Sequence, residues 1–245
     1  MSASDLESHL QRQLERSQSF FWNRVRWGVV GGYLPQQEPF ELVDVGAGPG
    51  FLGDFLASRY PNAEYRYVEP LESLEQSLVE RFGEAGNRRD GDSFGQAQFV
   101  TLLDVLEHQE HDRVFLNDLA EKMAPGSLLL LTVPAMPSLW SAWDEMLGHY
   151  RRYTKRSLTE TARGLPFEVE EVGYLFPELL PLGWVRRVRM NGKGSVDAGA
   201  STEFPDLPNW LNTAIYRISK PSSTLRRRWP AGTSVFAALR RSRNS

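Results

Sequence analysis

A strand-like run followed by four glycines within eight positions constrains the fold of this chain more than any other feature. In the segment ELVDVGAGPGFLG, from Glu41 to Gly53, Gly46, Gly48 and Gly50 follow the apolar run and precede the helical pattern FLGDFLASRY. Glycines at such a junction leave backbone N–H groups and a helix N-terminus open to a ligand. A tight turn without a ligand would explain the glycines but not their acidic neighbours. We therefore predict a binding loop.

Strand and helix patterns alternate on both sides of this loop. Apolar runs typical of covered strands span 40–46, 64–69, 98–104 and 127–134, and two later strands are expected at 167–175 and 233–241. Helical patterns lie at 19–34, 70–83, 111–126, 176–190 and 207–219, with a flexible loop at 191–205. This alternation predicts an α/β fold with a doubly wound sheet, whose ligands bind beyond the carboxyl ends of the strands.

The composition favours one domain with a basic cap. We expect a single domain over 1–245, with an N-terminal helical segment (1–36), a core (37–175 and 231–245) and a helical cap insertion (176–230). From Arg186 onward there are 12 Lys/Arg and 3 Asp/Glu, although the whole chain has a net charge of −3. The absence of cysteine excludes thiolate chemistry. The charged start of the chain and the lack of a long apolar run predict a cytoplasmic protein.

Two acidic residues indicate which nucleotide the loop binds. The glycines Gly48, Gly50 and Gly53 also fit the dinucleotide pattern G-x-G-x-x-G, and Glu69 stands where such a site has a ribose-binding acid. Asp44, however, interrupts the strand, and a carboxylate there needs a cation or hydrogen-bond donors. The ammonium group of S-adenosyl-L-methionine supplies a cation, whereas a pyrophosphate would be repelled. We expect Glu69 to bind ribose hydroxyls, and Asp90 or Asp92 to contact adenine.

The motifs VDVGAGPG, YVEP and LLDVLEH, in this order, resemble class I S-adenosylmethionine-dependent methyltransferases. The chain looks most similar to a bacterial small-molecule branch of ubiquinone-biosynthesis type O-methyltransferases, since VPAMPSLWSAWDEMLGHYRRYT and WPAGTSVFAALRR also resemble it. The resemblance implies a seven-stranded Rossmann-like sheet in the order 3-2-1-4-5-7-6, with strand 7 antiparallel. The segment between Glu84 and Gln98 is shorter than in relatives, so the resemblance does not assign a residue that contacts adenine.

The resemblance also implies site residues. Asp44, Gly46 and Gly48 would hold the methionine end of the cofactor, Glu69 the ribose, and Leu103 and Asp104 would lie along it. The full set expected to bind the cofactor is Asp44, Gly46, Ala47, Gly48, Gly50, Glu69, Pro70, Asp92, Leu103 and Asp104.

Methyl transfer to a hydroxyl group requires a base, and four residues are the candidates: His149, His108, Asp144 and Glu107. His149 is the first choice, with His108 and Asp144 as further catalytic residues. Asp104, Glu107 and His108 have a spacing that could bind a divalent metal, but helix capping or substrate orientation is the commoner role of such a group. We therefore predict no metal.

These observations predict an S-adenosylmethionine-dependent methyltransferase acting on an oxygen, less favourably a nitrogen or carbon, of a small metabolite, including one linked to a lipid or a glycan. An NAD(P)-dependent oxidoreductase and a non-catalytic cofactor-binding protein remain alternatives, the latter because Trp143 replaces a histidine common in relatives. The segment LLPLGWVRRVRM could contact a membrane surface through its apolar side, with Arg186, Arg187 and Arg189 on its polar side, although a solvated cap helix is the commoner interpretation of such a pattern. Nucleic acid is not an expected partner, and the oligomeric state is not predicted.

Overall fold

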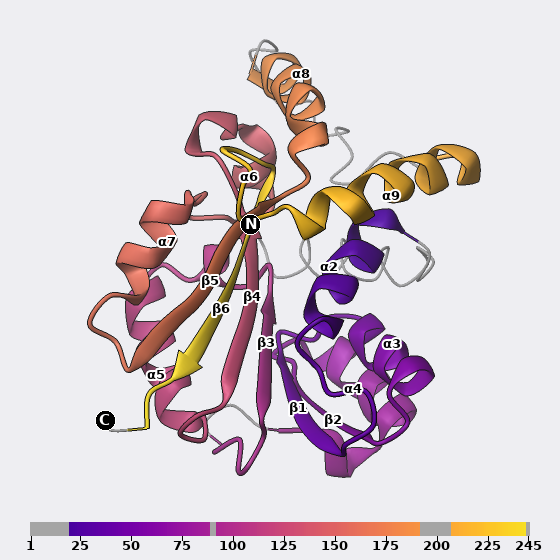
Figure 1. Cartoon of the computed structure of the whole chain (residues 1–245), viewed down its shortest axis with the longest axis vertical. Coiled ribbons are helices and arrows are strands. Elements are labelled where there is room, and N and C mark those ends of the chain that lie inside the picture. Colours follow the sequence, from indigo (N-terminus) through magenta and orange to yellow (C-terminus); the bar gives the residue numbers. More distant parts are fainter. Residues whose placement is uncertain (1–19, 89–91, 192–206, 244–245) are drawn as a thin grey trace.

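Six strands form one mixed sheet at the centre of the molecule (Figure 1). The structure is a computed structural model that describes residues 20–88, 92–191 and 207–243. The strand order is β2-β1-β3-β4-β6-β5, in which β1 to β4 run parallel and β6 runs antiparallel to both β4 and β5. The strands are β1 (Phe40–Val45), β2 (Ala63–Val68), β3 (Phe99–Leu103), β4 (Leu128–Pro134), β5 (Phe167–Leu175) and β6 (Ser234–Arg241). The predicted Rossmann-like α/β fold is confirmed, and the described strands lie within a residue of their predicted bounds.

The predicted number of strands is wrong, because the described residues form six strands rather than seven. The expected edge strand beyond β2 is reduced to one parallel bridge between Tyr67 and Asn87. A parallel connection needs a dozen or more residues to cross over the sheet. The chain between Asn87 and Phe99 must return past β2 and β1 to begin β3, so little length remains for pairing.

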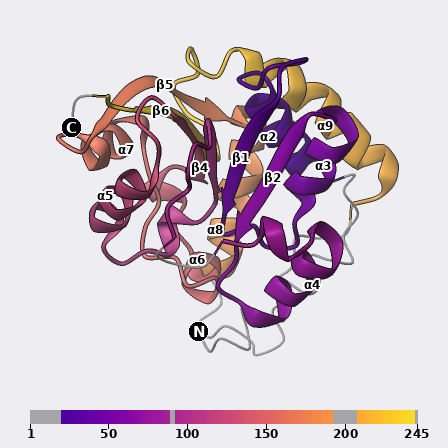
Figure 2. The same ribbon diagram turned by 90° about the horizontal axis from the view of Figure 1, so that it is seen from below.

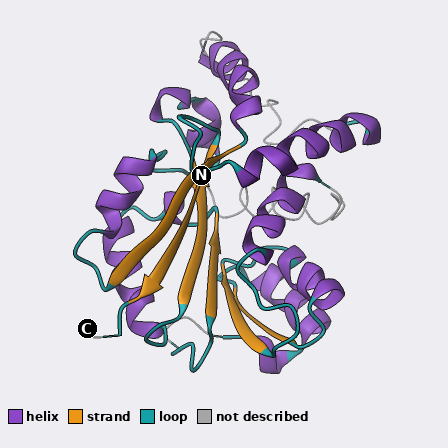
Figure 3. Cartoon of the chain, viewed as in Figure 1, coloured by secondary structure: helices purple, strands orange, loops and turns teal. Residues whose placement is uncertain are grey.

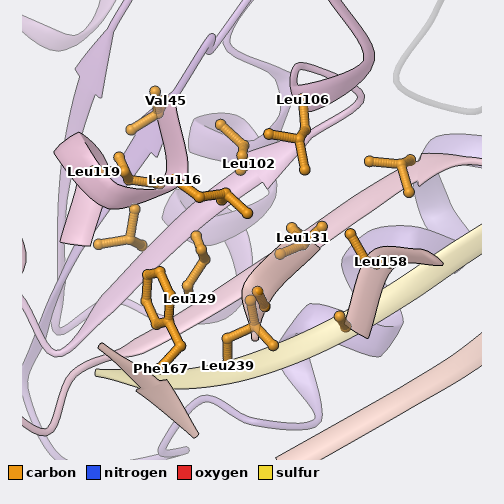
Figure 4. Packing of buried hydrophobic residues seen from close by; sticks show 14 of the residues in the cluster. Val45, Leu102, Leu106, Leu116, Leu119, Leu129, Leu131, Leu158, Phe167 and Leu239 are labelled. Atoms are coloured by element: carbon orange, nitrogen blue, oxygen red, sulfur yellow. The ribbon is translucent and has the colours of Figure 1, made fainter. Parts of the chain in front are cut away.

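Helices lie on both sides of the sheet (Figure 3), and successive residues of the central strands pack against opposite helical layers. Leu129 and Leu131 of β4 face α5 (Asp112–Lys122) and α7 (Lys155–Ala162), and Figure 4 shows them beside Leu116 and Leu158. Leu128 and Leu130 face the layer of α2 (Phe21–Gly31) and α3 (Phe51–Arg59). Burial on both faces explains the uninterrupted apolar runs of these strands.

Of the remaining helices, one packs on a face of the sheet and three lie at one end of it. Helix α4 (Glu72–Phe82) packs beside α3, and α6 (Ala142–Met146), α8 (Leu180–Asn191) and α9 (Asn209–Thr224) lie beyond the ends of the parallel strands (Figures 1 and 2). Helix α9 contacts α2. The predicted helices at 19–34, 176–190 and 207–219 are confirmed by α2, α8 and α9. Most of the loop expected at 191–205 lies outside the described residues.

Candidate active site

A cavity of about 330 Å³ lies at the carboxyl ends of β1, β3 and β4, between α2 and α8. Its position agrees with the predicted binding edge of a doubly wound sheet. Of the predicted site residues, the lining includes Asp44, Gly46, Ala47, Gly48, Leu103, Asp104, His108 and His149. It also includes Trp22, Arg26, Glu107, Trp143, Arg152 and Arg186, which come from segments far apart in the chain.

The glycines of the binding loop have two different roles. A Cβ atom at Gly46 would lie 2.5 Å from Val105 Cγ2, and one at Gly50 would lie 2.4 Å from Leu78 Cδ2. Both residues also have positive φ, so packing and backbone conformation exclude side chains there. A Cβ at Gly48 would have no atom within 4 Å, although its φ is +54°. Gly48 lines the cavity, so its open side is space that a ligand can occupy.

Asp44 is a buried carboxyl group at the end of β1. Thr101 Oγ1 donates to its Oδ1 at 2.7 Å, and the Tyr65 hydroxyl donates to its Oδ2 at 3.1 Å. Burial raises the pKa of Asp44 to about 6, although these two hydrogen bonds and the charge of Arg26 oppose the shift. Two neutral donors therefore leave the ionised form incompletely stabilised, and a ligand ammonium group at this point would complete it.

Glu69 holds the binding loop in place. Its carboxylate accepts the Gly48 N–H at 2.7 Å and the Leu71 N–H at 3.0 Å. Burial raises the pKa of Glu69 despite these two bonds. Glu69 does not itself line the cavity, but each oxygen retains a lone pair for a ribose hydroxyl.

Three other predicted cofactor residues lie outside the cavity lining. Gly50 is buried beneath the loop, and Pro70 and Asp92 are exposed. The structure therefore does not bring Asp92 to the other predicted residues, and Asp90 lies outside the described part of the chain.

Arg26 is a site residue that the sequence pattern did not reveal. It reaches from α2 across the strand ends, forms an ion pair with Asp104, and donates to Asn23 Oδ1 at 2.7 Å. Asp104 also accepts the Thr132 hydroxyl at 3.0 Å and has a φ of +58°. A strained non-glycine residue at a strand end is common at functional sites. A single arginine on an aromatic helix carries no sequence signal for this contact.

His149 is oriented by Asp144, which lies just behind the cavity. His149 Nδ1 lies 3.0 Å from Asp144 Oδ1, and Arg152 Nε donates to the same oxygen at 2.6 Å. Burial favours a higher pKa for Asp144, but the bonds from His149 and Arg152 outweigh it and lower the pKa. The ionised carboxylate accepts the Nδ1 proton, so Nε2 is the basic nitrogen of a neutral His149. The predicted group of His149 and Asp144 is thus formed.

Glu107 and His108 follow β3 in a short turn, Leu106–His108. The His108 ring lies 4.8 Å from the His149 ring, centroid to centroid. Glu107, His108 and His149 offer ligand atoms that all lie within 4.8 Å of one another, so they could bind a divalent metal. Burial, with the charge of Asp104, raises the pKa of Glu107 well above its usual range. Burial therefore disfavours the ionised carboxylate that a metal ion would need.

Helix α8 supplies the wall opposite the binding loop. The Arg186 guanidinium lies 3.4 Å from the centre of the Trp143 ring, and Leu182 and Gly183 line the same wall. The sequence pattern placed Arg186 with Arg187 and Arg189 on the polar side of a membrane-facing helix. The structure corrects this for Arg186, because that side chain faces the cavity.

Known proteins provide a family and a fold. Residues 7–172, more than half of the chain, match the family model described as "Methyltransferase domain". The trans-aconitate 2-methyltransferase of Methylobacterium nodulans is 29% identical over 112 residues, which are 41% of this chain and 41% of that protein.

Two solved structures share the fold at low sequence identity. Phosphoethanolamine N-methyltransferase 2 of Haemonchus contortus, in complex with S-adenosyl-L-methionine, has a TM-score of 0.59 and 15% identity over 90% of this chain and 53% of that one. The [4+2]-cyclase SpnF has a TM-score of 0.55 and 12% identity over 88% and 79% of the chains. The fold alone therefore does not fix the reaction.

Proposed function

This chain belongs to the methyltransferase-domain family, and we propose that it transfers a methyl group from S-adenosyl-L-methionine to an oxygen atom of a small acceptor. The observation that carries the proposal is a single cavity that brings two groups together. The buried carboxyl group of Asp44 lies on the side of the binding loop, and His149, a base that the Asp144 carboxylate orients, lies on the other side. The name of the trans-aconitate relative gives a small carboxylate substrate, which supports a small-molecule acceptor.

The residues of the cavity fit this donor. Asp44 binds the ammonium group, Gly48 leaves room for the chain of the amino acid, and Glu69 accepts hydrogen bonds from ribose hydroxyls. When bound, S-adenosyl-L-methionine supplies a methyl group on a positively charged sulfur that leaves readily. The protein aligns the acceptor and excludes water, which is the main catalytic contribution in such a transfer.

Nε2 of His149 removes the proton of the acceptor hydroxyl. Asp144 holds the ring through Nδ1 and stabilises the imidazolium that forms. Arg152 fixes Asp144 and donates to the Ala135 carbonyl at 3.1 Å, which ties this pair to the end of β4. A nitrogen acceptor remains the second candidate, since the phosphoethanolamine neighbour is named as an N-methyltransferase.

Titration calorimetry and labelled-methyl transfer test the proposal. We expect S-adenosylhomocysteine to bind and NADH not to bind, and acceptors are then found by screening small-molecule extracts with labelled donor. His149→Gln should lower kcat by about 10²–10⁴-fold, the usual contribution of a general base. It should not weaken the binding of S-adenosylhomocysteine. His111→Gln, at an exposed histidine, is the matched control.

Unchanged turnover in the His149 variant would exclude the base role. Cofactor binding without methylation of any acceptor would instead indicate a non-catalytic protein.

We further propose that the outer face of α8 contacts a lipid surface. Val185 and Val188 lie on one side of the helix with exposed fractions of 46% and 67%. Arg187 and Arg189 flank them, as in helices that lie at a membrane interface. Among the residues that the structure describes, no helix is long and apolar enough to cross a bilayer.

A further inference from the structure

The charged residues that line the cavity are separated by sign. The carboxyl groups of the described lining, Asp44, Asp104 and Glu107, all come from the ends of β1 and β3 or the turn after β3. Arg152 and Arg186 come from the segment after β4 and from α8. Arg26 stands on the acidic side, where it pairs with Asp104. The cavity therefore has an acidic side that suits a cationic donor and a basic side next to the cap.

Arg186 is held in a fixed orientation on this basic side. Its guanidinium stacks 3.4 Å from the centre of the Trp143 ring, and Trp143 is itself only 5% exposed. Stacking on an indole directs the N–H groups of the guanidinium into its own plane, which is the geometry in which an arginine binds two oxygens of an anion.

The surroundings of Arg186 favour an added negative charge. Burial, followed by the nearby charge of Arg152, lowers the pKa of Arg186 to about 10, and the charge of Asp144 opposes this shift only in part, so the group stays charged near neutral pH. Arg152 already donates to Asp144 and to Ala135. An anion beside Arg186 would reduce the repulsion between these two guanidinium groups.

The walls around Arg186 are apolar. Leu139, Leu147 and Leu182 line the same cavity as Arg186 and His149. A ligand that fits here has an apolar body in addition to a charged group.

We propose that Arg186, stacked on Trp143, binds an anionic oxygen group of the methyl acceptor, either a carboxylate or a phosphate. The acceptor is thus an anion with an apolar body, held beside the positively charged sulfur of the donor. This inference rests on the proposed function, because it places the acceptor at the cap side of the methyltransferase cavity.

The test uses the full chain saturated with S-adenosylhomocysteine and three probes that share a phenyl group: benzoate, phenyl phosphate and benzamide. We expect one of the two anions to bind at least tenfold more tightly than benzamide, which is neutral. The anion that binds more tightly shows whether the site prefers a carboxylate or a phosphate. Arg186→Gln should abolish this preference, and Arg186→Lys should retain part of it because the charge remains.

Arg189→Gln is the matched control, since it removes an exposed arginine from the same helix. It should leave the preference within twofold. Unaltered S-adenosylhomocysteine affinity in each variant shows that the protein is folded. Equal affinity for all three probes, no binding of either anion, or a preference that survives Arg186→Gln would overturn the inference. Failure of S-adenosylhomocysteine to bind the unaltered protein would instead overturn the proposed function.

Discussion

Asp44 combines a structural cost with a proposed role in binding the cofactor. The carboxyl group is 3% exposed and receives hydrogen bonds only from hydroxyl groups within the described chain. Its pKa rises from 3.8 to about 6 because burial penalises the ionised form. A folded-state pKa above the unfolded value means that this group destabilises the protein as the pH rises from about 4 to 6.

We expect Asp44→Asn to increase the free energy of unfolding of the cofactor-free protein at pH 8 by about 1–2 kcal/mol. The pKa shift corresponds to about 3 kcal/mol, and the loss of one hydroxyl hydrogen bond offsets about 1 kcal/mol. Denaturant titrations at pH 8 and at pH 4 measure the effect, which should shrink at pH 4 because the wild-type carboxyl group is then protonated. An equal gain at both pH values would contradict the electrostatic explanation.

The same residue predicts the pH dependence of cofactor binding. S-adenosylhomocysteine should bind progressively more weakly below about pH 6, because protonated Asp44 no longer attracts its ammonium group. At pH 7.5, Asp44→Asn should weaken binding tenfold or more, about 1.4 kcal/mol. Calorimetry from pH 5 to 8 checks both.

A second buried carboxyl group provides the control for that pH series. Burial also raises the pKa of Glu69, so Glu69→Gln separates its titration from that of Asp44. A pH slope that persists in Asp44→Asn and vanishes in Glu69→Gln would assign the effect to Glu69.

At the scale of elements, α8 connects two surfaces. Its inner side gives Gly183 and Arg186 to the cavity, while its outer side exposes Val185 and Val188. If the outer side lies on a membrane, the entrance of the acceptor side of the cavity is next to the lipid. The aromatic helix α2 closes the cofactor side, where Trp22 stacks on Phe176 with centroids 4.2 Å apart.

Replacing apolar residues on the outer side of α8 tests its contact with lipid. We expect the double variant Val185→Glu, Val188→Glu to reduce cosedimentation with vesicles containing phosphatidylserine at least fivefold, because two apolar side chains proposed to enter the lipid surface become charged. Val114→Glu is the matched control, since Val114 is a 59% exposed valine on α5. Equal losses in both proteins, or no binding of the unaltered chain, would contradict the proposal.

At the scale of the whole molecule, the last strand completes the core. β6 lies between β4 and β5, and most of its residues are buried on both faces. The sheet therefore closes only when residues near 240 pair with β4, more than a hundred positions earlier in the chain. Such long-range pairing predicts slow folding relative to helical proteins of the same size.

One substitution in β6 measures its contribution. Phe236 is fully buried between α2 and the sheet, so Phe236→Ala should lower the free energy of unfolding by about 3–5 kcal/mol. Val169→Ala, in the edge strand β5 at a 41% exposed position, should change it by less than about 0.5 kcal/mol. Denaturant unfolding followed by circular dichroism compares the two, and equal effects would show that β6 is peripheral to stability.

Patterns of neighbouring residues by themselves determined where the strands, the helices and the binding loop of this protein lie along the chain. Apolar runs with glycine and proline at their ends specify the strands and helices, because burial and turn chemistry act over a few positions. Asp44 and the binding loop could be found for the same reason, and so could His149 with Asp144, which are five residues apart.

Only the tertiary structure decided which distant side chains meet. Arg26 and Asp104 are 78 positions apart, Thr101 and Asp44 are 57 apart, and Arg186 reaches Trp143 from the cap. The loss of the seventh strand likewise depends on how far one connection must cross the sheet. Contacts of this kind follow from the paths of the crossovers and the side-chain rotamers, which the local pattern of residues does not encode.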